Sequence, residues 1–416
     1  MSKPIGPRRF WKRARLVFRY VVLTVVGLTM LLPFLWMIST SLKTKEGAVE
    51  VPPKWIPRTE NTYAKIDGRK TSVRLLKETA RVKRLDTGDV VELYKQAVRQ
   101  AKPWYQPWAD ETVTANIPAK DGVARGVPVQ VQSVTALVRI LDEGPRRHEI
   151  VSIPDRDVSV ESAVALNWSN YPETWNKLPF GRSYVNTAIV TVIVTFGQVL
   201  TSALAAFAFA RLRFPGRDKL FLGYLATMMI PGAVTLIPVY VLFVKMPELL
   251  NAVFHTTWFS QDLYFMGKYY VGRLIGGNSY FALIAPGLFS AYGTFMLRQF
   301  FMSLPRELED AARIDGCGNL RVWWHVTVPL SKVALATLAT FTFMGTWKAF
   351  MWPLIITNRE ELLPLQVLLQ RFVGQYGAEY TLLMAGSIIV LIPLLIVFLI
   401  GQRYFIKGIQ LGGVKG

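Results

Sequence analysis

The chain has 416 residues, of which 51% are hydrophobic and only 18% are charged, and its mean hydropathy is +0.29. Disorder requires low hydrophobicity, and an average soluble domain carries roughly 25% charged residues. The composition therefore excludes a largely disordered chain and argues against a wholly soluble one. The formal net charge of +20 is typical of proteins that meet nucleic acid or a membrane. The single cysteine, Cys317, excludes an internal disulfide, and the three histidines lack zinc-like spacing, so no metal site is predicted.

Six stretches are long and apolar enough to cross a bilayer as helices, which needs about 20 residues. None of them contains an acid, and Lys348 is the only charged residue inside them. The first stretch is too long for a signal-peptide core, so we interpret it as an uncleaved anchor. The sequence predicts an all-α polytopic membrane protein with six transmembrane helices. These are Tyr20–Thr40, Tyr184–Ala210, Leu220–Val244, Ser279–Leu297, Val333–Ile356 and Thr381–Ile400.

Positive charge gathers on one side of these spans. Residues 1–19, 211–219, 298–332 and 401–416 together hold 19 bases and five acids, whereas the other two short loops hold five of each. Loops rich in Lys and Arg stay in the cytoplasm. Both termini, 1–19 and the tail 402–416, are therefore predicted to be cytoplasmic. This topology accounts for most of the positive charge, so no nucleic-acid partner is expected.

A hydrophilic block, 41–183, separates the first two spans and is predicted to be extracytoplasmic. Arg81–Tyr94 alternates in polarity around an Asp-Thr-Gly-Asp turn, which predicts a β-hairpin. Gly126–Ile140 also alternates, with valines on one face. We expect a small, mostly β inserted domain over about 58–165. A loop between its strands is predicted at Pro103, Pro107 and Pro118.

The sequence lacks the motifs of an energy source or a covalent catalyst. It contains no G-x-x-x-x-G-K-[ST] phosphate loop, no spacing that indicates a catalytic triad, and no series of acids inside the spans for a proton relay. The sequence therefore predicts that the chain is not an enzyme. A passive channel, a receptor, or a subunit that another chain drives remain as the possible classes.

The loop 298–332 carries a distinctive local pattern, Ser-Leu-Pro-Arg-Glu-Leu-Glu-Asp-Ala-Ala-Arg-Ile-Asp-Gly from Ser303 onward. Glu309 and Arg313 form an i,i+4 pair, and Gly316 can adopt the left-handed conformation that ends a helix. A second helical stretch, Asn319–Val328, is expected to stop at Pro329. These features predict a short helix between two spans, and by themselves they leave a plain helical hairpin at the membrane surface open.

The full pattern, with Pro329 thirteen residues after Gly316, resembles the "EAA" loop of ABC importer permeases. Asp310 stands where that family usually has Glu. The resemblance extends to the carbohydrate (maltose-type) branch, and to its smaller permease in particular, over residues 1–57 and 167–416. Residues 58–165 have no counterpart there, and a smaller extra piece lies near Ala252–Asn278. The other similar stretches are Pro33–Lys43, Pro52–Pro57, Ala208–Arg217, Gly374–Gly377, Leu383–Gly386 and Gln402–Gly408.

The resemblance implies a type I importer permease domain over 184–401, placed in the inner membrane, that translocates a sugar or oligosaccharide. It implies a second permease subunit, two ATPase subunits that bind the ATP and Mg, and an extracytoplasmic sugar-binding protein. This chain would hold no cofactor itself. The residues implied to couple it to the ATPase subunits are Glu309, Asp310, Ala311, Ala312, Asp315, Gly316 and Pro329.

Three further residues are candidates for the substrate pathway or for contact with the binding protein. The resemblance points to the outer loop that carries Gln375 and Tyr376, between two glycines. Lys348 either lines the pathway or extends its ammonium group to the membrane surface, and both interpretations are open. Two rival functions differ in class: a receptor that senses a ligand through 41–183, and a secondary transporter. The receptor would need a larger cytoplasmic domain, and the transporter would need internal repeats and buried acids.

Overall fold

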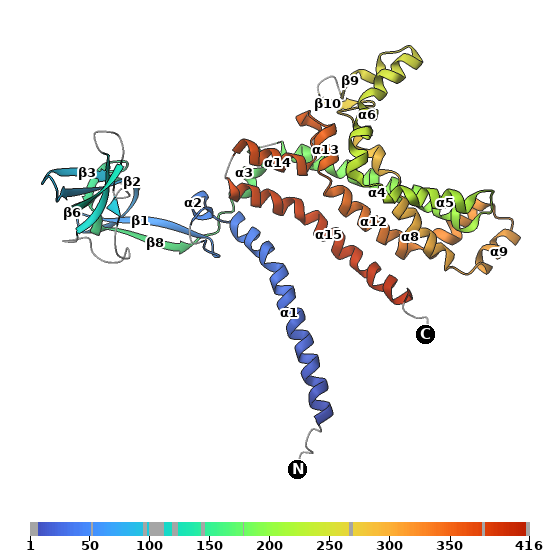
Figure 1. The fold of residues 1–416 in the computed structure, drawn as a ribbon, viewed down its shortest axis with the longest axis horizontal. Coiled ribbons are helices and arrows are strands. Elements are labelled where there is room, and N and C mark those ends of the chain that lie inside the picture. The colour runs from blue at the N-terminus through green and yellow to red at the C-terminus, as the bar shows by residue number, and fades with distance from the viewer. Residues whose placement is uncertain are drawn as a thin grey trace. The chain divides into compact units, whose positions relative to one another are not determined.

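A computed structural model describes residues 7–50, 53–94, 98–99, 112–118, 124–142, 146–177, 179–265, 269–376 and 379–412 (Figure 1). The chain divides into two compact units. The helical unit comprises Met1–Lys45 and Trp168–Gly416, and the β unit comprises Glu46–Asn167.

The β unit is an antiparallel sheet of eight described strands, in the order β4-β5-β6-β2-β1-β8, with β3 beside β2 and β7 beside β6. The expectation of a β-rich insert, with a hairpin at β2–β3 and a strand at β6, is confirmed. The strands are β1 (Arg58–Ile66), β2 (Arg69–Arg84), β3 (Val90–Tyr94), β4 (Val98–Arg99), β5 (Thr112–Pro118), β6 (Ala124–Ile140), β7 (Ile150–Pro154) and β8 (Val158–Val164).

The long strands β2 and β6 form the centre of this sheet and carry two apolar clusters. Val82 and Val129 are fully buried in one cluster, and Val138 is fully buried in the other. The predicted loop is wrong at Pro118, which ends strand β5. Proline can occupy a strand end because no ladder hydrogen bond is required of its nitrogen there. Pro103 and Pro107 lie outside the described residues.

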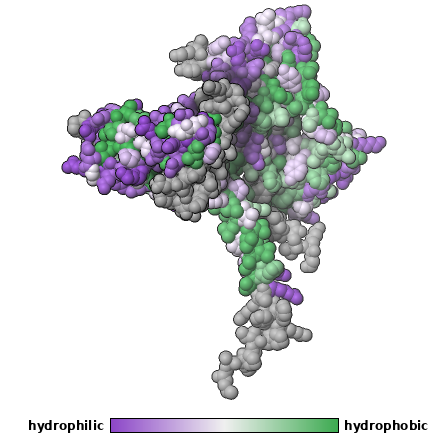
Figure 2. All heavy atoms as spheres, turned by 60° about the vertical axis from the view of Figure 1, so that its left-hand side comes forward, coloured by the Kyte–Doolittle hydropathy of each residue, from purple (hydrophilic) through white to green (hydrophobic). Residues whose placement is uncertain are grey.

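Four described helices of the helical unit are long and apolar enough to cross a membrane. They are Arg15–Ser41 of α1 (Pro7–Ser41), α4 (Phe180–Arg211), α6 (Gly232–Phe254) and Tyr380–Arg403 of α15 (Tyr380–Gly412). Two bent helix pairs would raise the number to six if each pair is one span. Exposed apolar side chains cover α1 (Figure 2), as expected for a helix surrounded by lipid.

The other elements are α2, which begins at Lys45 and continues into the β unit, and the shorter elements of the helical unit. They are α2 (Lys45–Ala48), α3 (Asn170–Lys177), α5 (Arg217–Ala226), α7 (Tyr280–Ile284), α8 (Ala291–Met302), α9 (Glu307–Ile314), α10 (Asn319–Val322), α11 (Val328–Leu330), α12 (Lys332–Trp347), α13 (Met351–Ile356), α14 (Leu365–Tyr376), and the two-stranded hairpin of β9 (Asp262–Phe265) and β10 (Tyr269–Arg273). That hairpin and the end of α6 make up the extra piece noted near Ala252–Asn278.

Three of the predicted spans are not single helices. The span predicted at Leu220–Val244 breaks between α5 and α6, because Pro231 forces the residue before it into an extended conformation. The span at Ser279–Leu297 bends by 40° between α7 and α8, at a short 3-10 turn that contains Pro286.

The span at Val333–Ile356 ends as helix α12 at Trp347 and restarts as α13. Pro353 cannot continue a helix from α12, since its ring would clash with the carbonyl four residues earlier. It is accommodated in the first turn of α13 instead.

A polar cluster fixes the end of α1 to the start of α15. The amide of Asn170 donates to the backbone oxygens of Ser41 (2.7 Å) and Lys43 (2.8 Å). The Glu379 carboxylate accepts from Lys177 and from Lys45, the latter at 3.0 Å. Hydrogen bonds from Lys177 and Lys45, together with their positive charges, hold the pKa of Glu379 below its usual value.

This cluster predicts a pH dependence of stability. Because the folded-state pKa of Glu379 lies below the value of 4.5 for the free group, its contribution is present above about pH 4.5 and is lost as the pH falls through the folded-state pKa. We expect Glu379→Gln to lower the thermal unfolding temperature at pH 7. The difference from the wild type should shrink below pH 4.5. A deficit that stays constant down to pH 3 would contradict this assignment.

Candidate functional site

Helix α9 is the short helix that the loop 298–332 was predicted to contain. Three acids, Glu307, Glu309 and Asp310, lie in its first turn, where the positive end of the helix dipole favours them. Gly316 has φ of +84°, as predicted. The amides of Gly316 and Cys317 donate to the oxygens of Arg313 and Ala312, both at 3.0 Å, which is the Schellman pattern of a helix end.

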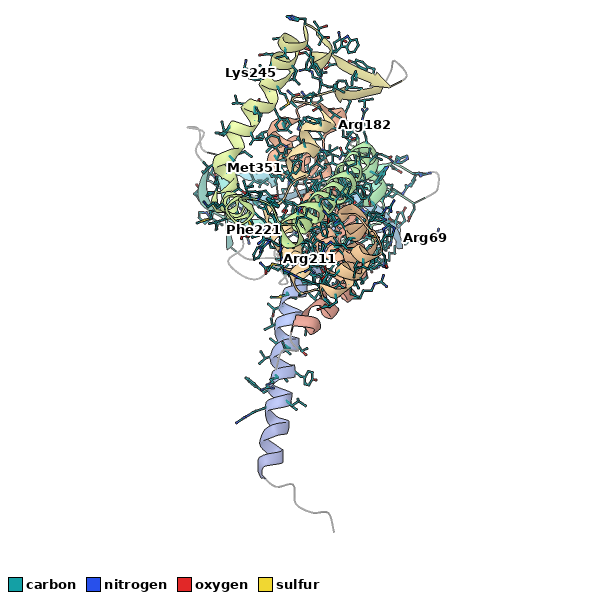
Figure 3. The ribbon with its side chains drawn as sticks, turned by 90° about the vertical axis from the view of Figure 1, so that its right-hand side faces the viewer. Arg69, Arg182, Arg211, Phe221, Lys245 and Met351 are labelled. Carbon is teal, nitrogen blue, oxygen red and sulfur yellow. The ribbon has the colours of Figure 1, made fainter. Side chains whose placement is uncertain are left out.

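The inner face of α9 is held by a buried ion pair. Arg211 Nε at the last residue of α4 lies 2.8 Å from Glu309 Oε1, and these side chains are 3% and 4% exposed. The N–H group does not point directly at the oxygen, so the contact is an ion pair and not a linear hydrogen bond. Arg211 also donates from Nη2 to the Leu304 oxygen at 2.9 Å. Figure 3 shows Arg211 among the packed helices.

Sequence reasoning gave Arg211 no role. The sequence does mark this residue, because Arg211 is the first charged residue after a long apolar span. Its partner could not be found from spacing, since Glu309 follows two spans later. The predicted pair of Glu309 with Arg313 is present but weaker, at 3.9 Å.

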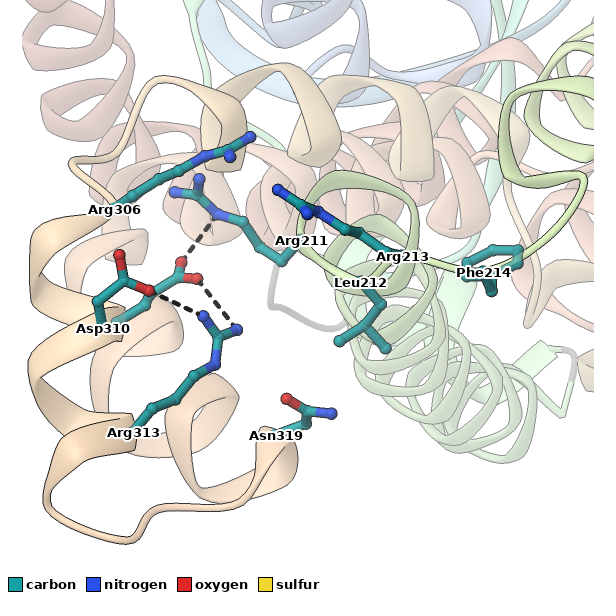
Figure 4. A pocket seen from close by; sticks show the side chains of 9 residues that line it. Arg211, Leu212, Arg213, Phe214, Arg306, Asp310, Arg313 and Asn319 are labelled. Atoms are coloured by element: carbon teal, nitrogen blue, oxygen red, sulfur yellow. Dashed lines mark hydrogen bonds and ion pairs between the residues drawn. The ribbon is translucent and has the colours of Figure 1, made fainter.

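A cavity of about 530 Å³ opens between α9 and the residues that follow α4 (Figure 4). Arg313 is bound there to Asp310 at 3.2 Å, whereas Arg213 and Arg306 are exposed and have no ion pair with the described residues. The cavity therefore carries an excess of positive charge. The described residues contain no cluster that could hold a metal ion. The lining is Arg211, Leu212, Arg213, Phe214, Arg306, Glu309, Asp310, Arg313 and Asn319.

The structure separates the predicted coupling residues into two faces. Glu309 is buried, and Ala312 is half-buried against the core that contains Val322 and Trp323. The opposite face is exposed and includes an isoleucine, Ile314, with 87% of its surface accessible. The predicted residues on the exposed side are Asp310, Ala311, Asp315 and Gly316.

Pro329 is exposed, and the helix that was predicted to stop there ends one residue later, at Leu330. A π-helical segment, Trp323–Thr327, follows α10, and the helix runs through Pro329 to Leu330. The amide of Val328 donates five residues back to Trp323. The wider turn moves the preceding carbonyls out of α-helical register, so the proline ring is accommodated where an α-helix would break.

The three candidates for the substrate pathway or for contact with the binding protein are only partly described. Lys348 caps the C-terminal end of α12 and is exposed. The backbones of Gln375 and Tyr376 form the last turn of α14, and their side chains lie outside the described residues. The structure brings none of these three residues to α9.

The buried pair predicts a large asymmetry between single and double substitutions. Arg211→Met or Glu309→Leu alone leaves an uncompensated buried charge and should cost about 3–5 kcal/mol of stability. The double substitution should recover most of that loss, because two apolar side chains replace two charges. Asp310→Ala is the control, since an exposed pair is worth about 1 kcal/mol or less. Thermal unfolding of the purified protein measures all four, and additive single effects would contradict a buried pair.

Residues 198–411 match the family described as "Binding-protein-dependent transport system inner membrane component". The chain is 31% identical over 262 residues to the arabinooligosaccharides transport system permease protein AraQ of Halalkalibacterium halodurans, covering 63% of this chain and 79% of the relative. It is 32% identical over 250 residues to the sn-glycerol-3-phosphate transport system permease protein UgpE of Yersinia pestis bv. Antiqua, covering 58% and 79%.

Among solved structures, a bacterial ABC transporter involved in the import of the acidic polysaccharide alginate matches with a TM-score of 0.47 and 25% identity, over 58% of this chain and 81% of that one. The family match spans more than half of the chain and includes α9 with its ion-paired Glu309. The chain therefore belongs to the family of inner-membrane components of binding-protein-dependent transport systems.

Proposed function

We propose that this chain is a transmembrane permease subunit of an ABC importer for a sugar or oligosaccharide, and that separate subunits hydrolyse the ATP. A second permease subunit, two ATPase subunits and an extracytoplasmic binding protein would complete the complex. The ATP and Mg would be held by the ATPase subunits. Family membership and relatives named for arabinooligosaccharides support the substrate class.

One observation carries the coupling role: α9 is fixed on one face and exposes an apolar residue, Ile314, on the other. The Arg211–Glu309 pair and the packing of Ala312 hold the inner face. The outer side exposes Ile314, and Leu320 lies exposed nearby with 72% of its surface accessible. Exposed apolar residues that a rigid support holds in place are typical of a docking surface.

This geometry transmits force in a simple way. A partner seated on the outer face of α9 pushes a helix that cannot shift independently of α4, because separating Arg211 from Glu309 would leave two buried charges unpaired. Movement of the ATPase subunits would therefore reach the membrane span α4 directly. The basic cavity beside α9 would receive an acidic side chain of the same partner.

The opposite side of the membrane would face the binding protein. We place the end of α14, with Gln375 and Tyr376, in that contact, and we place the β unit on the same side. The charge bias of the short loops supports this orientation, with both termini in the cytoplasm. We keep Lys348 as a candidate residue that lines the substrate pathway.

This topology is tested by limited proteolysis of intact cells or spheroplasts. Protease added from outside should cut within residues 58–165 and should leave the loop 298–332 intact. In inverted membrane vesicles the pattern should reverse. Cleavage of 58–165 only in inverted vesicles would refute the proposed orientation.

The coupling role is tested at Ile314 and Gly316. Ile314→Glu places a charge on the exposed face, and Ile314→Leu is the matched control. Gly316→Val should strain the left-handed helix end by roughly 1 kcal/mol or more, whereas Asn tolerates that conformation better, so Gly316→Asn is its control. We expect Ile314→Glu and Gly316→Val to insert in the membrane but to lose co-purifying ATPase subunits or sugar-stimulated ATP hydrolysis. Wild-type assembly and stimulation in both would refute the mechanism.

A further inference from the structure

A second cavity, of about 450 Å³, lies among α4, α12, α13 and the broken segment from α7 to α8. Its volume falls within the roughly 300–1,000 Å³ of small-molecule sites. None of its thirteen described lining residues is charged. The polar and aromatic members of the lining are Gln198, Tyr292, Phe341, Thr342, Thr346 and Trp352.

The polar groups of this cavity are arranged around one internal hydrogen bond. The Gln198 side chain donates from Nε2 to Thr342 Oγ1 at 2.9 Å. Within the described part of the chain, the Gln198 Oε1 atom and the hydroxyls of Tyr292 and Thr346 have no hydrogen-bond partner. An amide oxygen accepts and a hydroxyl both donates and accepts, so this set matches the hydroxyl groups of a sugar.

The indole of Trp352 is held in a fixed orientation at the cavity. Its Nε1 donates to the Ala282 oxygen at 2.9 Å, and its ring meets the edge of Phe243 at a centroid distance of 5.6 Å. A fixed aromatic ring beside a few polar groups is the usual composition of a site for a partly apolar ligand.

Gly345 keeps the cavity open. It lies within α12, and a Cβ atom added there would have no heavy atom within 4 Å. Packing therefore does not require glycine at this position, and glycine is unfavourable inside a helix relative to alanine. A larger side chain at this position would therefore enter the space of the cavity without displacing a neighbour.

We infer that this cavity receives one uncharged sugar unit of the substrate during translocation, an inference that rests on the proposed function. Its lining supplies no cation to pair with an acidic sugar or a phosphate. An unpaired anion among membrane helices is strongly unfavourable, whereas a neutral sugar needs only hydroxyl and amide partners. Lys348 is near in sequence to Gly345 and Trp352, but it is not part of the lining.

The test is uptake by the complete complex that co-purifies with this chain, reconstituted in liposomes with its binding protein. The neutral probe is an arabinooligosaccharide, and the anionic probes are an alginate oligosaccharide and sn-glycerol 3-phosphate. Gly345→Leu places a side chain in the cavity and should lower uptake of the neutral probe about tenfold or more, because it occupies volume that a sugar unit would need. Gln198→Leu should lower it as well, because a sugar hydroxyl loses its acceptor.

The matched control is Gly223→Leu. Gly223 also lies in a helix, α5, with open space at its Cβ position and outside the cavity. This variant should import as the wild type does. Co-purification of the other subunits shows that each variant still assembles.

The outcomes separate the two proposals. Import of the anionic probes alone, or undiminished import by Gly345→Leu, would overturn the neutral-sugar cavity and leave a sugar importer standing. Loss of subunit assembly in Gly345→Leu would show that a helix of the second permease fills the space, and would also overturn it. Failure of every saccharide, neutral or anionic, would count against the proposed function itself.

Discussion

The ion pair between Arg211 and Glu309 is the constraint on which the proposed coupling geometry depends. Both side chains are almost fully buried, so separating them would leave two desolvated charges without the attraction that compensates for their burial. Arg211 also binds the Leu304 oxygen in the turn that precedes α9. The end of α4, this turn and α9 therefore behave as one body, and a contact on the exposed face of α9 acts on a membrane span and not on a loose loop.

The N-terminal end of α4 is also held in place, by side-chain hydrogen bonds. Arg182 donates from Nε to the Glu361 oxygen at 2.8 Å, and Asn186 donates to the same oxygen at 2.9 Å. The segment that they hold leads directly into α14. Helix α4 has 32 residues and is therefore about 48 Å long. One uninterrupted helix thus joins the proposed coupling site to the segment that we assign to binding-protein contact, while the helices beside it are broken at prolines.

The sequence allowed the apolar stretches, the β-rich insert and the helix end at Gly316 to be predicted, because each depends on local composition or on the conformation of one residue. The proline-glycine pair at Pro231 indicates the bend in the third span, and the structure breaks there. Hydropathy could not locate the breaks near Pro286 and Pro353, since an apolar window has the same average whether its helix is straight or broken. It also could not find Arg211, whose partner lies two spans away. The uncharged cavity depends on five elements meeting in space, and no spacing in the sequence indicates that meeting.

The β unit shows how a large insertion can be accommodated in a membrane subunit. Its first and last strands, β1 and β8, pair antiparallel from Arg58 opposite Val164 to Ala64 opposite Val158. The chain therefore enters and leaves the sheet at adjacent points. Within the helical unit, Asn170 still reaches the backbone of Ser41 and Lys43 across the sequence gap that the insert creates. Because the insertion begins and ends on paired strands, it does not have to separate the end of α1 from α3.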